Sequence, residues 1–428
     1  MSIERGTPVF RRVTVALFLG GFVTFANLYS VQPLLPVLVF EFGVTPSDAS
    51  LVVSVATATL AVCLMLTAHL SDRWGRKPVM VASMIASSAL ALASAFSPTF
   101  PLLLVTRALT GIVLAGLPAS AMAYLGDEVH PSSAGLAMGL YISGTTIGGM
   151  SGRVITGTIA GASTWRIALA ALAGICLLCS AWFWRNLPSG TGHAGHSSRA
   201  PLGDRASARA SAHSGQSALA PLLRALRSGV SLRLFGVAAL LMGSFVPMYN
   251  YLGFELLGPP YRVPQVFVGG IFLTYLVGTF SSTWMGHRAD RLGHRATLRA
   301  SIALMLAGAL ITAAPPLILK IAGLAVFTFG FFGAHSIASA WVARHAGADK
   351  AHAASLYLLF YYAGASAGGW AGGLFWTHLT WLGLVAMLAT LLAGALLTTL
   401  GLPLRVSPAS TAEAEATEFP EAAAATSP

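Results

Sequence analysis

Charged residues are scarce in this chain. Of its 428 residues, 9% are Asp, Glu, Lys or Arg, whereas a soluble domain usually carries about 25%. Hydrophobic residues make up 55% of the chain, and the mean hydropathy is +0.73. These values exclude a string of soluble domains and predict one membrane-embedded unit.

Several signatures of enzymes and pumps are also absent. The sequence has no Gly-x-x-x-x-Gly-Lys-Ser/Thr loop and no His-Glu-x-x-His. A nucleotide-driven pump and an enzyme are therefore disfavoured, and we expect no catalytic residue, no metal ligand and no cofactor. The three cysteines, Cys63, Cys176 and Cys179, lie inside apolar runs, so we interpret them as small buried apolar side chains.

Long apolar runs recur twelve times, each with about the 20 residues that cross a bilayer. The predicted spans are residues 13–37, 49–70, 78–96, 101–124, 133–159, 166–186, 232–255, 265–286, 297–314, 317–342, 353–376 and 381–403. The sequence therefore predicts an all-α membrane protein with twelve transmembrane helices in two pseudo-symmetric six-helix bundles, 1–186 and 232–404. Residues 187–231, rich in Ala, Ser, Gly and Arg, are expected to form a cytoplasmic linker, and 405–428 a disordered cytoplasmic tail.

The basic residues predict the orientation in the membrane. Twenty of the 25 Lys and Arg lie on the side of the N-terminus, and the opposite ends of the spans hold Arg166, Arg262 and Lys320. By the positive-inside rule, both termini and the linker are cytoplasmic. The net charge of +11 lies in the gaps between apolar runs and forms no basic face, so we expect no nucleic-acid partner.

Two motifs occur twice, at nearly the same offset. Residues 68–77 read AHLSDRWGRK and residues 286–295 read GHRADRLGHR, so Asp72 and Asp290 are 218 residues apart. The fifth and eleventh predicted spans carry glycine ladders whose offset is 220: Gly144, Gly148, Gly149 and Gly152, then Gly364, Gly368, Gly369 and Gly372. Repeated halves are typical of secondary transporters. Close helix packing alone also explains such ladders.

The repeated cassette resembles the G-x-x-x-D-R-x-G-R-K signature of the major facilitator superfamily, with Ala68 in place of the first glycine. Arg107 with Gly111 resembles the superfamily's Arg-x-x-x-Gly element. The ladder of the fifth span resembles the antiporter motif G-x-x-x-G-P-x-x-G-G but lacks its proline. The stretches that begin at Tyr29 and Asn250 are most similar to the YnfM-like group of drug:proton antiporter relatives, which implies an exporter.

The resemblance implies a latch between the bundles at the cytoplasmic side. Asp72 would face the N-terminus of the eleventh span, where helix-end N–H groups attract an anion, and Arg76 would reach Asp127. Arg344 occupies the equivalent place in the second half, so Arg295 lacks an acid. The expected latch residues are Asp72, Arg73, Gly75, Arg76, Asp127, Asp290, Arg291, Gly293 and Arg295. The alternative is that the cassette charges only set the orientation.

The substrate cavity is expected where the spans carry polar residues. The first and seventh spans each contain a polar-aromatic stretch, which we interpret as a break, and Arg107 and Arg153 are charges within spans. The candidates are Asn27, Tyr29, Gln32, Arg107, Arg153, Tyr249, Asn250, His335, Tyr361 and Tyr362. The alternatives are that the arginines extend towards the interface, and that His335 and the aromatic rings only pack.

The positions of the acidic residues indicate which of them could carry a proton during transport. Of the 14 acids, Glu255 is the one predicted within a span, so we expect it to carry the proton, with Arg107 or Arg153 nearby. His335 is the second candidate, and an interface anchor is the alternative for Glu255. We expect a monomeric carrier that exports a small organic solute, sugar-like or a drug, across a bacterial inner membrane with protons. The rivals are an organic-anion uptake carrier, a uniporter, and a transporter-like sensor or scaffold.

Overall fold

The structure, a computed structural model, describes residues 3–188 and 219–404, and these residues are almost entirely helical. In this described part, nine helical stretches are long and apolar enough to cross a membrane. One of them, His352–Gly401, has two arms that meet at Thr380, a residue with φ of 56°. Together with α7 and α14, these stretches match the twelve predicted spans.

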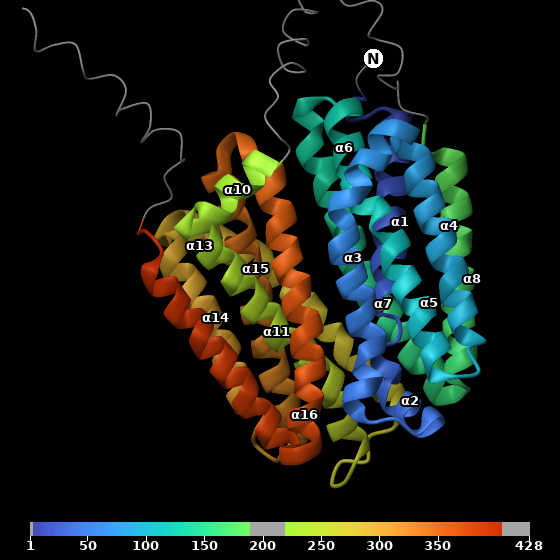
Figure 1. Cartoon of the computed structure of the whole chain (residues 1–428), viewed down its shortest axis with the longest axis vertical. Coiled ribbons are helices and arrows are strands. Elements are labelled where there is room, and N and C mark those ends of the chain that lie inside the picture. Colours follow the sequence, from blue (N-terminus) through green and yellow to red (C-terminus); the bar gives the residue numbers. More distant parts are fainter. Residues whose placement is uncertain (1–2, 189–218, 405–428) are drawn as a thin grey trace, which may run out of the picture.

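The N-terminal bundle occupies the blue-to-green half of Figure 1. Its elements are α1 (Pro8–Tyr29), η1 (Gln32–Leu34), α2 (Leu35–Phe42), α3 (Pro46–Trp74), α4 (Arg76–Ala95), α5 (Phe100–Leu114), α6 (Gly116–Glu128), α7 (Pro131–Ala162) and α8 (Trp165–Asn186). The fourth span is thus divided between α5 and α6, and the first between α1 and α2.

The C-terminal bundle occupies the yellow-green-to-red half (Figure 1). Its elements are α10 (Leu219–Arg227), α11 (Gly229–Leu257), α12 (Gln265–Gly270), η3 (Ile271–Thr274), α13 (Tyr275–Leu292), α14 (His294–Ile311), α15 (Leu317–Ala346), η4 (Gly347–Asp349), α16 (Lys350–Thr398) and η5 (Thr399–Gly401).

Glycines join one pair of parallel helices in each bundle. On α7, a Cβ added at Gly144, Gly148 or Gly152 would overlap the α1 backbone at Phe18, Phe22 and Ala26 in turn. On α16, a Cβ at Gly364, Gly368 or Gly372 would overlap α11 at Ala239, Gly243 and Pro247. The absence of side chains therefore lets the helix backbones touch over three successive turns, and the two halves repeat the same contact.

The structure corrects the predicted linker. Residues 189–218 lie outside the described residues, as does the predicted tail, but 219–227 form α10 and α11 begins at Gly229. Leu222 and Ala225 lie on the more buried face of α10. Arg224 binds Asp349, which precedes α16, at 3.0 Å. A short amphipathic helix was missed because it has only nine residues and lies at the end of a polar segment.

The predicted break in the seventh span is also wrong. The helix α11 continues through Tyr249 and Asn250 and even contains Pro247. The hydroxyl groups of Tyr249 and Tyr251 bond to other helices rather than to α11 itself, so they do not interrupt it. In the C-terminal bundle, the interrupted span is instead the eighth, where η3 separates α12 from α13. The predicted break in the first span is confirmed, since η1 separates α1 from α2.

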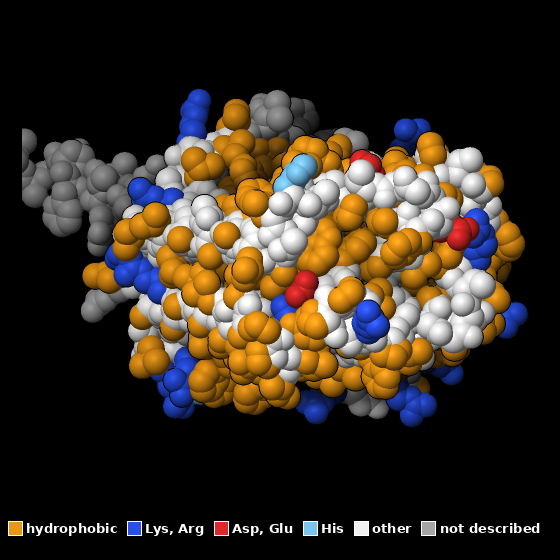
Figure 2. All heavy atoms as spheres, turned by 90° about the horizontal axis from the view of Figure 1, so that it is seen from below, with side chains coloured by type: hydrophobic (Ala, Val, Ile, Leu, Met, Phe, Trp, Pro, Cys, Tyr) orange, Lys and Arg blue, Asp and Glu red, His pale blue; other side chains and the backbone are white. Residues whose placement is uncertain are grey.

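The bundles touch near one end and spread apart towards the end that carries the N-terminus (Figure 1). Hydrogen bonds join Ser47 to the carbonyl of Trp370 at 3.2 Å, and Thr57 to Ser366 at 2.9 Å. Gln265 donates to the carbonyl of Pro33 at 2.7 Å. Figure 2 views this touching end and shows mainly hydrophobic and uncharged side chains, with scattered charges. We call it the closed end.

Candidate functional site

A chain of buried polar side chains crosses from one bundle to the other. Arg153 of α7 donates from Nε to Gln32 Oε1 at 2.6 Å. Gln32, which begins η1, donates from Nε2 to Asn250 Oδ1 of α11 at 2.7 Å. The exposed fractions of the three side chains are 3%, 2% and 1%. The break in the first span and the polar stretch of the seventh therefore meet directly, and Arg153 joins them.

Aromatic rings surround the Arg153 guanidinium. Its carbon lies 4.1 Å from the ring centroid of Tyr29 in the same bundle. It also lies 4.9 Å from the ring of Tyr275 and 5.1 Å from that of Phe272, both in the other bundle. Attraction between a cation and ring faces stabilises a guanidinium that is removed from water. We call these three rings the Arg153 cage.

Arg107 has a different environment. Its guanidinium donates to the carbonyls of Val52 at 3.0 Å, Asn27 at 3.0 Å, and Leu28. With an exposed fraction of 1%, it ties α5 to the end of α1 and to α3. The geometry favours a structural role, because main-chain carbonyls already accept from its Nε and from both of its terminal nitrogens.

Two other cavity candidates bond within their own bundles. The Asn27 side chain donates to Ser87 and Ser88 of α4, both at 3.3 Å. The Tyr249 hydroxyl bonds to Thr274 at 2.7 Å and Thr328 at 2.6 Å. Both side chains are fully or almost fully buried, so they brace helices in this structure.

His335 belongs to an aromatic cluster between α15 and α16. Its Nδ1 lies 2.9 Å from the hydroxyl of Tyr357, and its ring is stacked on Phe331. The Tyr361 ring is 4.8 Å from His335 and packs edge-on against Tyr362. The imidazole is partly exposed, so the structure leaves this titratable group accessible within a span.

The expected environment of Glu255 is wrong. Its carboxylate pairs with Lys320 at 2.8 Å, whereas Arg107 and Arg153 bond to main-chain carbonyls and Gln32. Lys320 is 2% exposed, and it also donates to the carbonyl of Thr312 at 3.1 Å and faces the Trp381 ring. From the sequence, Lys320 was predicted to be one of the charges at the outer ends of the spans. Nothing in the local sequence indicated its partner, because 65 residues separate the pair.

The cassettes form matching turns. Gly75 and Gly293 have φ of 88° and 92°, a backbone conformation that favours glycine, and each lies between two helices. Arg76 forms an ion pair with Asp127, as expected. In the second copy, Asp290 lies 3.4 Å from Arg344, and Arg295 donates to the carbonyl of Leu400. The two copies therefore share the turn. The ion pair of Arg76 with Asp127 has no equivalent in the second copy, where the acid of the pair, Asp290, belongs to the cassette itself.

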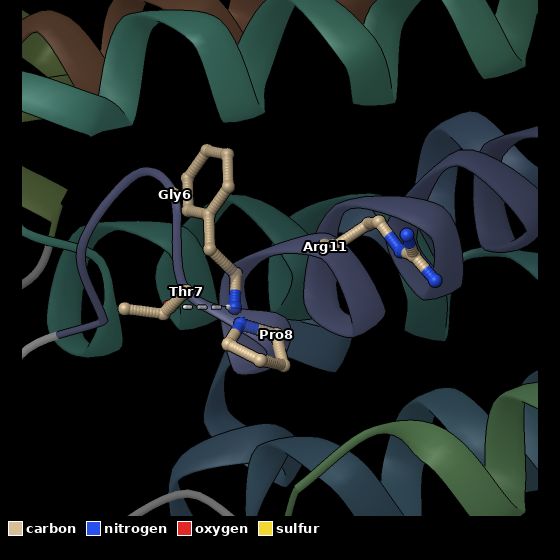
Figure 3. Close-up of a pocket in the computed structure, with 5 residues that line it drawn as sticks. Gly6, Thr7, Pro8 and Arg11 are labelled. Atoms are coloured by element: carbon tan, nitrogen blue, oxygen red, sulfur yellow. Dashed lines mark hydrogen bonds between the residues drawn. The ribbon is translucent and has the colours of Figure 1, made fainter.

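The other predicted latch contacts stay predictions. Asp72 lies in α3, but its side chain is outside the described residues. Arg73 follows it in the last turn of α3, and Arg291 has the same place in α13. Near the end where the bundles spread apart, a hollow of about 350 Å³ is lined by Gly6, Thr7, Pro8, Phe10 and Arg11. Figure 3 shows it beside the turn where Thr7 caps α1, at the opposite end of that helix from Tyr29.

The chain is 47% identical over 394 residues to an uncharacterized MFS-type transporter of Bacillus subtilis, YybF, covering 92% of this chain and 94% of the relative. It is 42% identical over 401 residues to the inner membrane transport protein YnfM of Escherichia coli, covering 92% and 91%.

Solved structures share the architecture. A bacterial homolog of the human lysosomal transporter Spinster, inward-facing and unoccupied, superposes with a TM-score of 0.71 at 16% identity, covering 92% of this chain and 94% of the other. The inward-open xylose transporter XylE of E. coli gives 0.70 at 13% identity, covering 92% and 96%. Residues 17–369 match the Major Facilitator Superfamily. The chain is a multi-pass membrane protein of the major facilitator superfamily of transporters.

Proposed function

We propose that this protein is a secondary transporter that moves a small organic solute across a bacterial inner membrane by alternating access, with both termini in the cytoplasm. The observation that carries the proposal is that the bundles touch near one end and spread apart towards the other in Figure 1. The ion-paired cassette of Arg76 and Asp127 lies at the spread end. This arrangement fits an inward-facing state, as in the two solved transporters named above.

The closed end must separate for the solute to cross. Its polar contacts are hydrogen bonds of short polar side chains, such as Thr57 to Ser366 and Ser47 to the carbonyl of Trp370. Each such bond contributes only about 1 kcal/mol. Gly157 of α7 also packs against Gly269 of α12 across the bundles. This contact is shorter than the glycine ladders, which hold helix pairs together inside each bundle over three turns. The motion is therefore expected between bundles.

Export coupled to protons is the proposed direction and driving force. YnfM is named an inner membrane transport protein, and a shorter match of 31% identity over 129 residues is to a multi-drug resistance efflux pump of Streptococcus pneumoniae. His335 is the better proton carrier of the two candidates, because it has no charged partner among its contacts in the described residues. Glu255 is held by Lys320.

The test begins with counterflow in proteoliposomes, using a panel of sugars, drugs and organic acids. In a variant without Cys63, Cys176 and Cys179, Thr57→Cys with Ser366→Cys places two thiols across the closed end. Oxidation should form a disulfide and stop exchange, and reduction should restore it. Thr57→Cys alone is the matched control and should exchange before and after oxidation. Full exchange by the cross-linked protein would contradict alternating access at this gate.

A further inference from the structure

We infer that Arg153 and Asn250 bind a carboxylate of the transported solute, and that this carboxylate replaces Gln32 as the acceptor of Arg153. The inference rests on the proposed function and names its substrate class: a small organic carboxylate whose apolar part packs against the aromatic rings. Three independent features of the described residues carry it: charge, hydrogen-bond capacity and the surrounding apolar surface.

The first feature is an unbalanced charge. Arg153 is 3% exposed, and its contacts in the described part of the chain include no carboxylate. The carboxylate of Glu255 is held by Lys320. A buried charge without a counter-charge is costly in a membrane protein and usually marks a substrate or ion pathway. A negatively charged ligand would balance Arg153.

The second feature is a donor with no acceptor. A guanidinium only donates, so Gln32 must present Oε1 to Arg153 and Nε2 to Asn250. Asn250 must then present Oδ1 to Gln32, which leaves its own Nδ2 free to donate. That nitrogen is buried and has no hydrogen-bond partner in the described structure. Connected buried donors without an acceptor indicate that an acceptor-rich group such as a carboxylate binds there.

The third feature is the apolar surface around Arg153. The rings of Tyr29 and Tyr275 supply apolar faces there. On the side of Asn250, Gly369 of α16 packs closely: a Cβ built there would lie 3.4 Å from Asn250 Nδ2 and 3.0 Å from Ser54 Oγ, so a side chain would crowd the amide. A carboxylate attached to a flat apolar group matches the rings.

Arg107 shows what a structural arginine looks like in the same fold. It is equally buried, but three main-chain carbonyls accept from its guanidinium. Arg153 instead uses exchangeable side-chain acceptors, Gln32 and the hydroxyl of Tyr275, and the carbonyl of Gly149. A ligand can displace the Gln32 amide, because that side chain can rotate about its own bonds. A ligand cannot displace the backbone carbonyls of packed helices.

Displacement of Gln32 would also act on the gate. Gln32 spans the bundles through its bond to Asn250, so a carboxylate that takes its place at Arg153 removes the polar chain that crosses the closed end. The solute then favours the outward-open state by its different affinity for the two states. Binding from the cytoplasm and opening to the outside would be coupled by one exchange of acceptors.

The experiment uses the full-length protein in nanodiscs and three probes of nearly the same shape: benzoate, benzamide and benzamidine, which carry negative, zero and positive charge. Thermal unfolding is followed by the fluorescence of the tryptophans. Benzoate should raise the unfolding midpoint in a saturable way at concentrations up to about 10 mM, a range that detects millimolar dissociation constants. Benzamide and benzamidine should not.

Two variants assign the effect to the site. Arg153→Gln should weaken benzoate binding about tenfold or more. Gln32→Glu supplies an internal carboxylate of the same size, so it should abolish the benzoate shift while the protein stays folded, which covers the case in which Arg153→Gln misfolds. Arg166→Gln, at an exposed ion pair with Glu41, is the matched control and should respond like the parent.

Three results would overturn the inference: an equal shift with benzamide or benzamidine, an unchanged benzoate shift in Gln32→Glu, or no benzoate shift in the parent protein. None of these bears on alternating access, which the cross-link between positions 57 and 366 tests separately. Conversely, benzoate binding that depends on Arg153 without any exchange in liposomes would keep the anion site and contradict the transport function.

Discussion

The pair of Glu255 and Lys320 gives a sharp prediction about stability. Lys320 is 2% exposed and Glu255 is 17% exposed, with 2.8 Å between Nζ and Oε1. Removal of one partner of a buried pair costs about 3–5 kcal/mol, because the other charge is left unpaired. Lys320 would keep the carbonyl of Thr312 and the Trp381 ring, and Glu255 is not fully buried. We therefore expect Glu255→Gln to lower the free energy of unfolding by about 2–3 kcal/mol.

The assay is unfolding in detergent, followed by circular dichroism, with a second substitution that removes the stranded charge. Lys320→Met in the Glu255→Gln background should recover most of the lost stability, because an apolar side chain of similar length is not penalised by burial. Glu41→Gln is the matched control: its partner Arg166 is 39% exposed in its side chain, so the loss should be at most about 1 kcal/mol.

The same variants decide whether Glu255 carries protons. If the pair is structural, the double variant should retain transport driven by an imposed pH gradient. A cost of Glu255→Gln no larger than that of Glu41→Gln would refute the argument from burial. Loss of gradient-driven transport in a stable double variant would return Glu255 to the proton pathway.

Three further outcomes are expected. Gly148→Ala should reduce the yield of folded protein, because its Cβ would overlap the α1 backbone, whereas Gly139→Ala, with nothing within 4 Å, should not; equal yields would contradict backbone contact. His335→Gln should abolish transport driven by a pH gradient but keep counterflow, and retention of both would exclude it as the proton carrier. Asp127→Asn should reduce transport more than Asp290→Asn, whose side chain is 58% exposed; equal losses at equal protein levels would refute the asymmetry of the two cassettes.

Features repeated in both halves could be predicted from the sequence. Gly75 and Gly293 need a positive φ, and the sequence indicates this because each glycine follows Asp-Arg in a short gap between apolar runs. The ladders that include Gly148 and Gly368 also follow from sequence, since small residues spaced four apart permit close contact between helices. Such features depend on local chemistry and on repetition.

Apart from the pair of Arg76 with Asp127, which the family resemblance implied, features that depend on distant partners could not be predicted. The sequence indicated that Gln32, Asn250 and Arg153 belong to a polar region, but not that they form one hydrogen-bonded chain, because their contacts join segments up to 218 residues apart. The pairing of Lys320 with Glu255 was missed for the same reason. The break wrongly expected in α11 shows the opposite error: tyrosine hydroxyls within an apolar run can find partners on neighbouring helices without disturbing their own.

The glycine contacts between α1 and α7 separate what can vary in this protein from what cannot. Arg153 follows Gly152 on α7, so its backbone is fixed against α1 by three glycines that accept no side chain. The Arg153 cage, in contrast, is made of side chains and not of backbone. Changes at Tyr29, Phe272 or Tyr275 would therefore alter which solute the inferred site binds, while the packing of α1 against α7 stays the same. One inherited frame could in this way serve carriers of quite different cargo.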